Sequence, residues 1–249
     1  MKKTPISGLG YLFKGIALIT KPGLRIYVTI PLLINSLLFG IGIWYGYGQV
    51  QLVMEKVSSF LPEWLAWLSW LLIPLFIIAT VVLLFFTFTI VANLISAPFN
   101  SLLAEKVEEL LTGEKLPQGE GGWQRIIKDT LPLIMNEIGK IGYFLAWTIP
   151  LLILFIIPVV NIAAPFIWLV FSAWMLVVQY ADVPMANHEL SGKEIRRRLK
   201  TQRFTSLAFG GGVLMMTMVP VLNFISMPVA VAGATAMWVD RLKGLETPQ

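Results

Sequence analysis

Residues 64–104 read WLAWLSWLLIPLFIIATVVLLFFTFTIVANLISAPFNSLLA, which is 41 consecutive residues without a charged side chain. Three further charge-free windows cover residues 26–54, 141–181 and 204–239, and the four windows together hold 147 of the 249 residues. A soluble protein has charge along every surface element and about a quarter of its residues charged, whereas this chain has 13%. The windows therefore predict an all-α integral membrane protein.

The remaining composition narrows the class of protein further. The chain is long enough for one membrane domain at residues 1–249 and has no room for a separate soluble domain. It contains no cysteine and a single histidine, His188, so the sequence predicts neither a disulfide nor a metal site. Walker, HExxH and GxSxG sequences do not occur. We therefore expect no catalytic residue, no cofactor and no enzyme activity.

The distribution of Lys and Arg predicts which way the protein faces. If every window leaves and re-enters on the same side, 18 of the 19 Lys and Arg residues share that side, and only Lys56 lies opposite. The positive-inside rule then places both termini in the cytoplasm. We interpret the net charge of +5 as an orientation signal and a contact with anionic membrane lipids, rather than as a surface for nucleic acid.

Apolar periodicity and breaks predict the order of the elements. We expect an amphipathic interfacial helix at 1–21, a first spanning helix at 24–48, an aromatic segment and a long second helix at 64–112, a cytoplasmic amphipathic helix at 123–140, hairpins at 141–181 and 204–240, and a basic cytoplasmic segment at 182–203. The second helix should end at Gly113. At about 40 residues it would measure about 60 Å, twice the hydrocarbon core, so it should project into the cytoplasm.

The two hairpins resemble each other. Pro158 and Asn161 recur as Pro220 and Asn223 at an offset of 62 residues, which predicts a helix pair around a Pro/Asn turn in each window. The helix before each turn is shorter than the roughly 20 residues that a full crossing needs. Each pair is therefore either a re-entrant, partly penetrating hairpin or two ordinary tilted spans.

Lys21-Pro22-Gly23-Leu24-Arg25 is the strongest local signal for a ligand. A glycine turn that opens a helix presents free backbone N–H groups, and Arg25 adds forked donors with a full positive charge. Together these groups suit a small oxyanion. The alternative is that Arg25 merely extends toward the membrane surface and contributes to the positive-inside signal.

A polar face interrupts the apolar second helix. Asn93, Ser96 and Asn100 lie at positions i, i+3 and i+7, and Glu105 follows near the end of the face. Such amides and hydroxyls either replace part of an ion's hydration shell along a pathway or form hydrogen bonds between helices. If Glu105 lines an anion pathway, it should be paired with a Lys or Arg, because an unpaired carboxylate would repel the anion.

The chain resembles the CysZ family of bacterial sulfate permeases in six segments that span nearly its whole length. The segments are YLFKG at 11–15, PGLR at 22–25, PLLIN at 31–35, APFNSLLAE at 97–105, FSAWM at 171–175 and MPVAVAGATAMWVD at 227–240. The resemblance implies sulfate uptake across the bacterial inner membrane for cysteine biosynthesis, two long spanning helices with two partly penetrating helix pairs, and a homo-oligomer.

The resemblance also implies which residues bind sulfate. The Gly-Leu-Arg of the family corresponds to Gly23, Leu24 and Arg25. Many members carry a second arginine next, where this chain has Ile26, which implies weaker binding here or an arginine supplied from elsewhere.

Three functions remain to be distinguished on the sequence. The leading hypothesis is a passive or gradient-driven anion pathway for sulfate. The second is a membrane scaffold that transports nothing and recruits partners through its Gly42-xxx-Gly46 spacing and its cytoplasmic helices. The third, an enzyme acting on lipid, would need a nucleophile or metal cluster that the sequence lacks.

Overall fold

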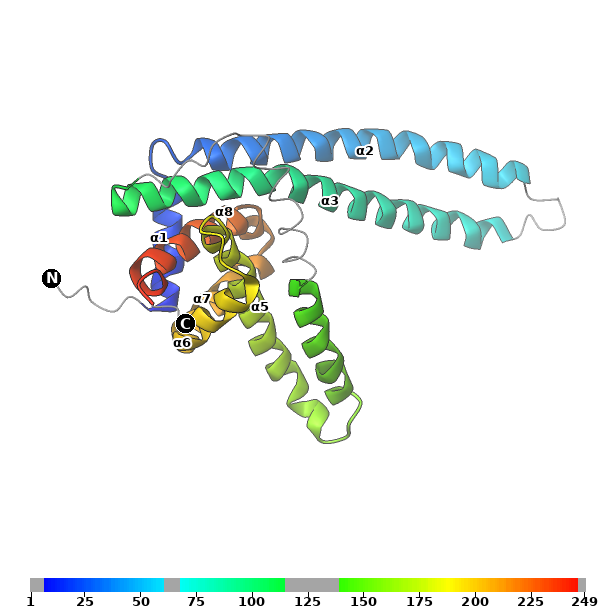
Figure 1. The fold of residues 1–249 in the computed structure, drawn as a ribbon. Helices are drawn as coiled ribbons and strands as arrows, with labels where there is room; N and C mark the ends of the chain where they lie inside the picture. The colour runs from blue at the N-terminus through cyan, green and yellow to red at the C-terminus, as the bar shows by residue number, and fades with distance from the viewer. Residues whose placement is uncertain (1–6, 61–67, 115–138, 246–249) are drawn as a thin grey trace. The chain divides into compact units, whose positions relative to one another are not determined.

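The computed structural model describes residues 7–60, 68–114 and 139–245, and all regular secondary structure in these ranges is helical (Figure 1). This confirms the predicted all-α class. The chain divides into two compact units. Unit 1 comprises Met1–Val28 and Asn100–Gln249, and unit 2 comprises Thr29–Phe99. The cytoplasmic helix expected at 123–140 lies outside the described residues except for its last two positions.

Unit 2 is formed by parts of two long helices, α2 (Ile26–Phe60) and α3 (Ser69–Thr112), which pack antiparallel. The Phe39 and Phe88 rings lie 5.2 Å apart between centroids. The apolar span of α2, Ile26–Gln49, lies close to the spanning helix expected at 24–48, but the helix itself continues to Phe60, because residues 49–60 contain neither Gly nor Pro to stop it.

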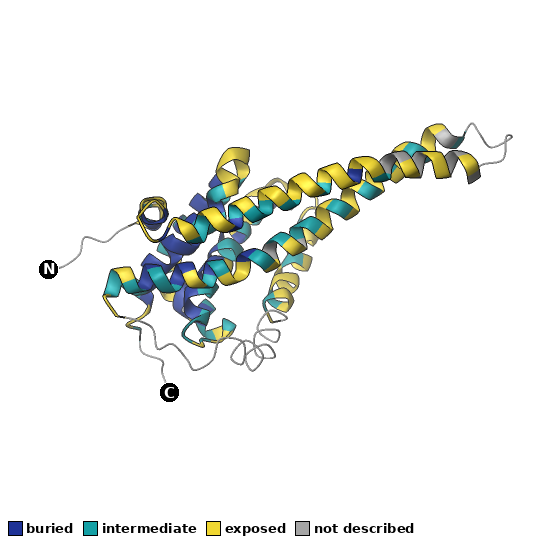
Figure 2. Ribbon diagram, turned by 90° about the horizontal axis from the view of Figure 1, so that it is seen from above, coloured by how far each residue is buried: buried dark blue, intermediate teal, exposed yellow. Residues whose placement is uncertain are grey.

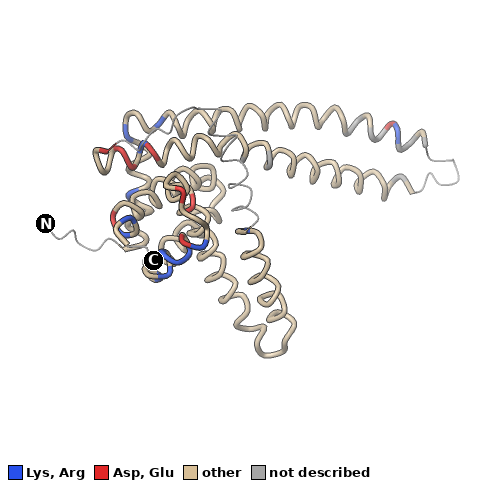
Figure 3. The backbone as a smooth tube through the Cα atoms, viewed as in Figure 1, with Lys and Arg blue, Asp and Glu red and all other residues tan. Residues whose placement is uncertain are grey.

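The two helices of unit 2 expose their apolar side chains along most of their length, coloured yellow in Figure 2. Within the described part of this unit the only charged residues are Glu55 and Lys56 (Figure 3). A helix pair of this kind cannot be stable in water and is suited to hydrocarbon. α3 has 44 residues and so measures about 66 Å, more than twice the thickness of the hydrocarbon core.

Unit 1 is built around α8 (Pro220–Met237), which packs against α1 (Gly8–Ile19), α5 (Ala164–Ala186) and α7 (Arg203–Met218). Every residue from 229 to 237 is buried, so this half of α8 is covered on all sides. Small residues make this possible. Gly15 of α1 approaches the Val229 carbonyl, and Gly233 of α8 lies against the backbone of Tyr11.

The two hairpins each join a shorter helix to a longer one. The first pairs the apolar helix Gly139–Leu154 with α5 through a turn that contains the 3-10 helix η2 (Val160–Ile162), and the second pairs α7 with α8. The repeated asparagines occupy equivalent places, because the N–H of Asn161 donates to Ile157 and that of Asn223 to Val219. The turn of the first hairpin is the longer one. In the second hairpin α7 ends at Met218 and α8 begins at Pro220, whereas in the first the helix Gly139–Leu154 is followed by η2 before α5 begins at Ala164.

Four described helices are long and apolar enough to cross a membrane, which indicates a multi-pass membrane protein. They are Ile26–Gln49 of α2, Trp70–Thr112 of α3, α5, and α8 continued into the π-helix η3 (Trp238–Leu242). The shorter hairpin helices have 16 residues each, or about 24 Å, less than a hydrocarbon core of about 30 Å. Partial penetration by these two helices stays a prediction.

Candidate functional site

The turn between α1 and α2 holds the predicted sulfate-binding residues, all within unit 1. α1 ends at Ile19, and Gly23 then adopts a φ of +86°, a left-handed conformation that glycine tolerates best. Leu24 is 4% exposed and anchors the turn in the core, while Gly23 and Arg25 on either side of it are exposed. The buried Leu24 side chain therefore fixes the turn in the core, while the Gly23 backbone and the Arg25 side chain remain exposed at the surface.

Arg25 is oriented by one hydrogen bond. Its Nε donates to the carbonyl oxygen of Thr20 at 2.6 Å, and its two Nη groups bond to no described residue. The backbone N–H groups of Leu24 and Arg25 donate to Lys21, whereas that of Gly23 donates to no acceptor among the described residues. The guanidinium fork and the Gly23 N–H are thus donors available to an oxyanion.

Two features of the turn limit its strength as an anion site. The Thr20 carbonyl belongs to the C-terminal end of α1, where the helix dipole is negative, so part of the Arg25 charge already stabilises that end. Ile26 is 54% exposed and adds no second cation. The exposed Lys21 is the nearest other cation in sequence.

The polar face predicted on α3 is divided between the two units. In unit 2, Ser96 accepts a hydrogen bond from the Asn35 Nδ2 of α2 at 3.1 Å, so it joins two helices as in the alternative interpretation. The Asn35 Oδ1 is buried and has no partner among the described residues. The side chain of Asn93 lies outside the described residues, although its backbone belongs to α3.

Asn100 and Glu105 belong to unit 1. Asn100 is 6% exposed, and its Nδ2 is buried without a partner in the described part of the chain. The adjacent Ser101 donates from Oγ to Asn187 Oδ1 at 2.8 Å, and the Asn187 amide donates back to the Ser101 carbonyl at 3.1 Å. Glu105 is half-buried and forms no ion pair within residues 7–60, 68–114 and 139–245. The Lys or Arg partner expected for it is therefore not found in these ranges.

A buried ionic cluster lies close to Glu105 along α3, and sequence reasoning missed it. Glu108 is 2% exposed, and its Oε2 lies 2.9 Å from Nε2 of His188. The Nζ of Lys243 lies 2.9 Å from the other carboxylate oxygen. The Trp238 ring packs against His188, with 5.2 Å between centroids. Since His188 and Lys243 are 80 and 135 positions from Glu108, no spacing in the sequence could have indicated their contact.

The basic segment at 182–203 is more ordered than a solvated charge run. It contains α6 (Gly192–Thr201), in which Arg198 is buried, donating to the Leu242 carbonyl at 2.7 Å and to Glu194 at 2.8 Å. Burial raises the pKa of the Glu194 carboxyl, but hydrogen bonds from Arg197 and Arg198 outweigh this, and the pKa lies below its ordinary value. Part of the basic charge therefore holds the C-terminal end of the chain in place.

The described residues contain no group of three His, Asp or Glu side chains that could hold a metal ion. The family model described as sulfate transporter CysZ/etoposide-induced protein 2.4 matches residues 11–228, which is most of the chain. The match includes the α1–α2 turn and the whole of α3.

Proposed function

The chain belongs to the sulfate transporter CysZ/etoposide-induced protein 2.4 family, and from that premise we propose that it is a sulfate permease. The observation that carries the proposal is the α1–α2 turn, where Arg25 is exposed and held by Thr20 while the Gly23 N–H is unbonded among the described residues. A doubly charged tetrahedral anion matches these donors. Gly23, Leu24 and Arg25 are the proposed binding residues, and the buried side chain of Leu24 anchors the turn in the core of unit 1.

The proposed route passes along α3, whose face of Asn93, Ser96, Asn100 and Glu105 would be pathway-lining, with the Lys or Arg that Glu105 requires supplied from outside the described residues. The buried Asn100 amide without a partner in the described part of the chain supports this, because an unsatisfied donor is costly unless something polar meets it. Flux would be passive or driven by a gradient. We propose uptake across the bacterial inner membrane for cysteine biosynthesis, both termini in the cytoplasm, and a homo-oligomeric assembly.

Flux in liposomes tests the proposed function directly. Purified protein reconstituted in liposomes should take up labelled sulfate faster than protein-free vesicles prepared identically. Repeating the assay with and without a proton or sodium gradient distinguishes a passive pathway from a coupled one. If uptake equals that of empty vesicles under all of these gradients, the chain is not a sulfate permease.

Replacing Arg25 by alanine should weaken sulfate binding several-fold or more, because the variant loses the only fixed guanidinium of the turn. Equilibrium dialysis with labelled sulfate measures the affinity. Lys21→Ala is the matched control, since it removes one exposed positive charge from the same turn without touching the bond to Thr20. Equal losses in the two variants would mean that general charge attracts sulfate and that Arg25 is no specific ligand.

A scaffold is the second candidate, because the family description joins a sulfate transporter with etoposide-induced protein 2.4. Gly46 of the Gly42-xxx-Gly46 spacing does not support this role, since it packs inside the chain, where an added Cβ would lie 2.7 Å from Leu84. Gly42 has open space around it. A scaffold predicts no sulfate flux and a loss of function when residues 123–140 are altered.

A further inference from the structure

The buried carboxylate of Glu108 is surrounded by donors from distant parts of the chain. The Nε2 atom of His188 lies 3.0 Å from its Oε1 and 2.9 Å from its Oε2, and the Nζ atom of Lys243 lies 2.9 Å from Oε1. Only 2% of Glu108 is exposed, so water contributes little to the stabilisation of its charge. The protein donors therefore take the place of its hydration, as they do for any bound anion.

The indole of Trp238 adds a further donor beside this cluster. Its ring packs on the His188 imidazole, with 5.2 Å between centroids, and its buried Nε1 has no acceptor among the described residues. The Lys243 N–H donates to the Trp238 carbonyl at 2.9 Å and closes the π-turn of η3, a kind of turn that is frequent at functional sites. A buried N–H without an acceptor is costly, so this indole indicates room for an acceptor that the described part of the chain does not supply.

Glu108 continues the polar face of α3 that is proposed to line the anion route. Asn100 and Glu108 are both buried and eight residues apart, so they lie on the same broad face, about 12 Å apart along the helix. The end of α5 runs beside this face, because Asn187 bonds to Ser101 and the next residue, His188, contacts Glu108. The face that begins with the proposed route therefore leads to the donors around Glu108.

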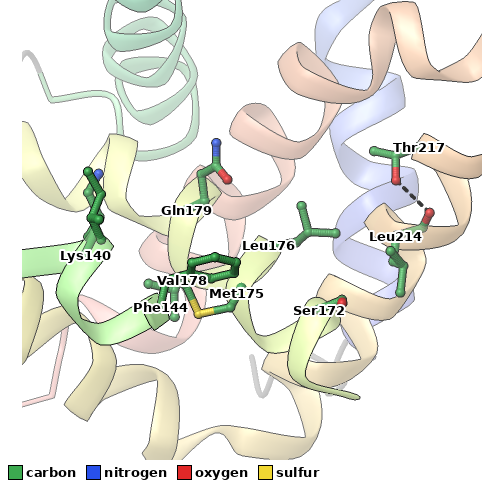
Figure 4. Close-up of a pocket in the computed structure, with 10 residues that line it drawn as sticks. Lys140, Phe144, Ser172, Met175, Leu176, Val178, Gln179, Leu214 and Thr217 are labelled. Carbon is green, nitrogen blue, oxygen red and sulfur yellow. Dashed lines mark hydrogen bonds between the residues drawn. The ribbon is translucent and has the colours of Figure 1, made fainter. Parts of the chain in front are cut away.

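A groove of about 540 Å³ elsewhere in unit 1 is less suited to an anion (Figure 4). It lies between the helix Gly139–Leu154, α5 and α7, and its walls are mainly apolar, as at Phe144. Lys140 is the charged residue that lines it, and its Nζ lies 2.9 Å from Asp182. One ammonium group that already has a carboxylate partner does not make an oxyanion site, whereas an imidazole, an ammonium and an indole gather around Glu108.

We propose that the place held by the Glu108 carboxylate is an oxyanion-binding position on the route along α3, and that Glu108 is a tethered occupant which the passing anion displaces. His188, Lys243 and the Trp238 indole then bind the anion in its place. The side chain of Lys243 is 38% exposed, which connects the cluster with the surface. The position is separate from the α1–α2 turn. Its ability to bind an anion does not depend on transport, whereas the displacement rests on the proposed function.

Truncating Glu108 should create a measurable anion site. In an Arg25→Ala background, which removes the proposed ligand of the turn, Glu108→Ala should gain one bound sulfate per chain in equilibrium dialysis with labelled sulfate. Sulfate at ten times the dissociation constant should also raise the melting temperature of this variant in detergent by about 3 to 6 °C. Glu108→Ser is made in parallel, so that one misfolded variant does not end the test.

Glu109→Ala in the same background is the matched control. It removes the same charge from the next position of α3, where the partner Lys106 is 42% exposed, so a solvated ammonium is left and no site should be gained. Adding Lys243→Met to Glu108→Ala should abolish the gained site, because it removes the ammonium that binds the anion. Equal sulfate binding after truncation of Glu108 and of Glu109, or no gain in either Glu108 variant, would overturn the binding position.

Sulfate flux in liposomes tests the displacement. With Arg25 intact, Glu108→Ala should lower the sulfate concentration for half-maximal uptake several-fold, because sulfate no longer competes with a tethered carboxylate. An unchanged concentration would place the position off the route and overturn the displacement. Absence of uptake by the wild type would instead contradict the sulfate permease, and the displacement with it, while the dialysis result would still decide the binding position.

Discussion

Replacing Gly210 by alanine is expected to prevent stable packing of unit 1. A Cβ at Gly210 would overlap the backbone carbonyl of Ala173, so α5 and α7 could not keep their present contact. The backbone of Ala173 cannot move away by a change of rotamer, as the end of a long side chain can. Overpacking of this kind lowers the free energy of unfolding by about 3 kcal/mol or more. The measurement is the fraction of protein that stays monodisperse in detergent after heating, followed by size-exclusion chromatography.

Gly211 provides the matched control for this variant. It is the next residue of α7 and has nothing within 4 Å of an added Cβ. Gly211→Ala should therefore leave stability unchanged or raise it by up to about 1 kcal/mol, since alanine favours the helix over glycine. Similar melting behaviour for the two alanine variants would show that α5 and α7 are not in the close contact described above.

Removing both side chains that contact the Glu108 carboxylate is the second change with a large expected effect. In the double variant His188→Leu, Lys243→Met, a carboxylate that is 2% exposed loses the imidazole and the ammonium group that contact it. An unpaired buried charge costs about 3 to 5 kcal/mol, which for a chain of this size lowers the melting temperature by about 10 °C. The apparent melting temperature in detergent measures the loss.

A third substitution separates the charge effect from lost packing. Adding Glu108→Leu to the double variant removes the stranded carboxylate and should restore most of the stability, because an apolar replacement of a whole buried ionic group is often neutral. Lys106→Met on the same helix is the control, since its pair with Glu109 is at the surface and should matter little. No recovery in the triple variant would mean that packing, and not charge, explains the loss.

The parts of the fold that could be predicted depend on local pattern. Charge-free windows indicate helices in lipid without any knowledge of packing, and α3 ends at Thr112 with Gly113 at a φ of +76°, the conformation for which glycine is the usual helix terminator. The end of α2 was not predictable in this way. The charge-free window that predicts the first span ends at Met54, but a helix needs no membrane to continue to Phe60.

The candidate site, like the fold, has features that local sequence pattern predicts and others that depend on how the chain packs. The α1–α2 turn lies within five residues, so its glycine turn and its arginine could be singled out as a candidate from local pattern, whereas their assignment to sulfate came from the resemblance to the CysZ family. The hydrogen bond from Arg25 to the Thr20 carbonyl could not be predicted from the sequence, because it depends on the conformation of the folded turn. Contacts between distant segments, such as Glu108 with His188, depend on how helices pack, and apolar periodicity leaves this open.

The packing of α1 against α8 has a consequence for biosynthesis. Tyr11 leaves the ribosome long before Gly233. In the folded protein Gly233 packs so closely against the backbone of Tyr11 that no side chain fits between them. At 5 to 20 residues per second, the 222 residues from one to the other take about 10 to 45 s to synthesise. Throughout this interval α1 is a nascent helix without its partner. Its outward apolar residues Leu9, Phe13 and Ile16 could rest in the membrane surface meanwhile, so a chain truncated before α8 would leave α1 there.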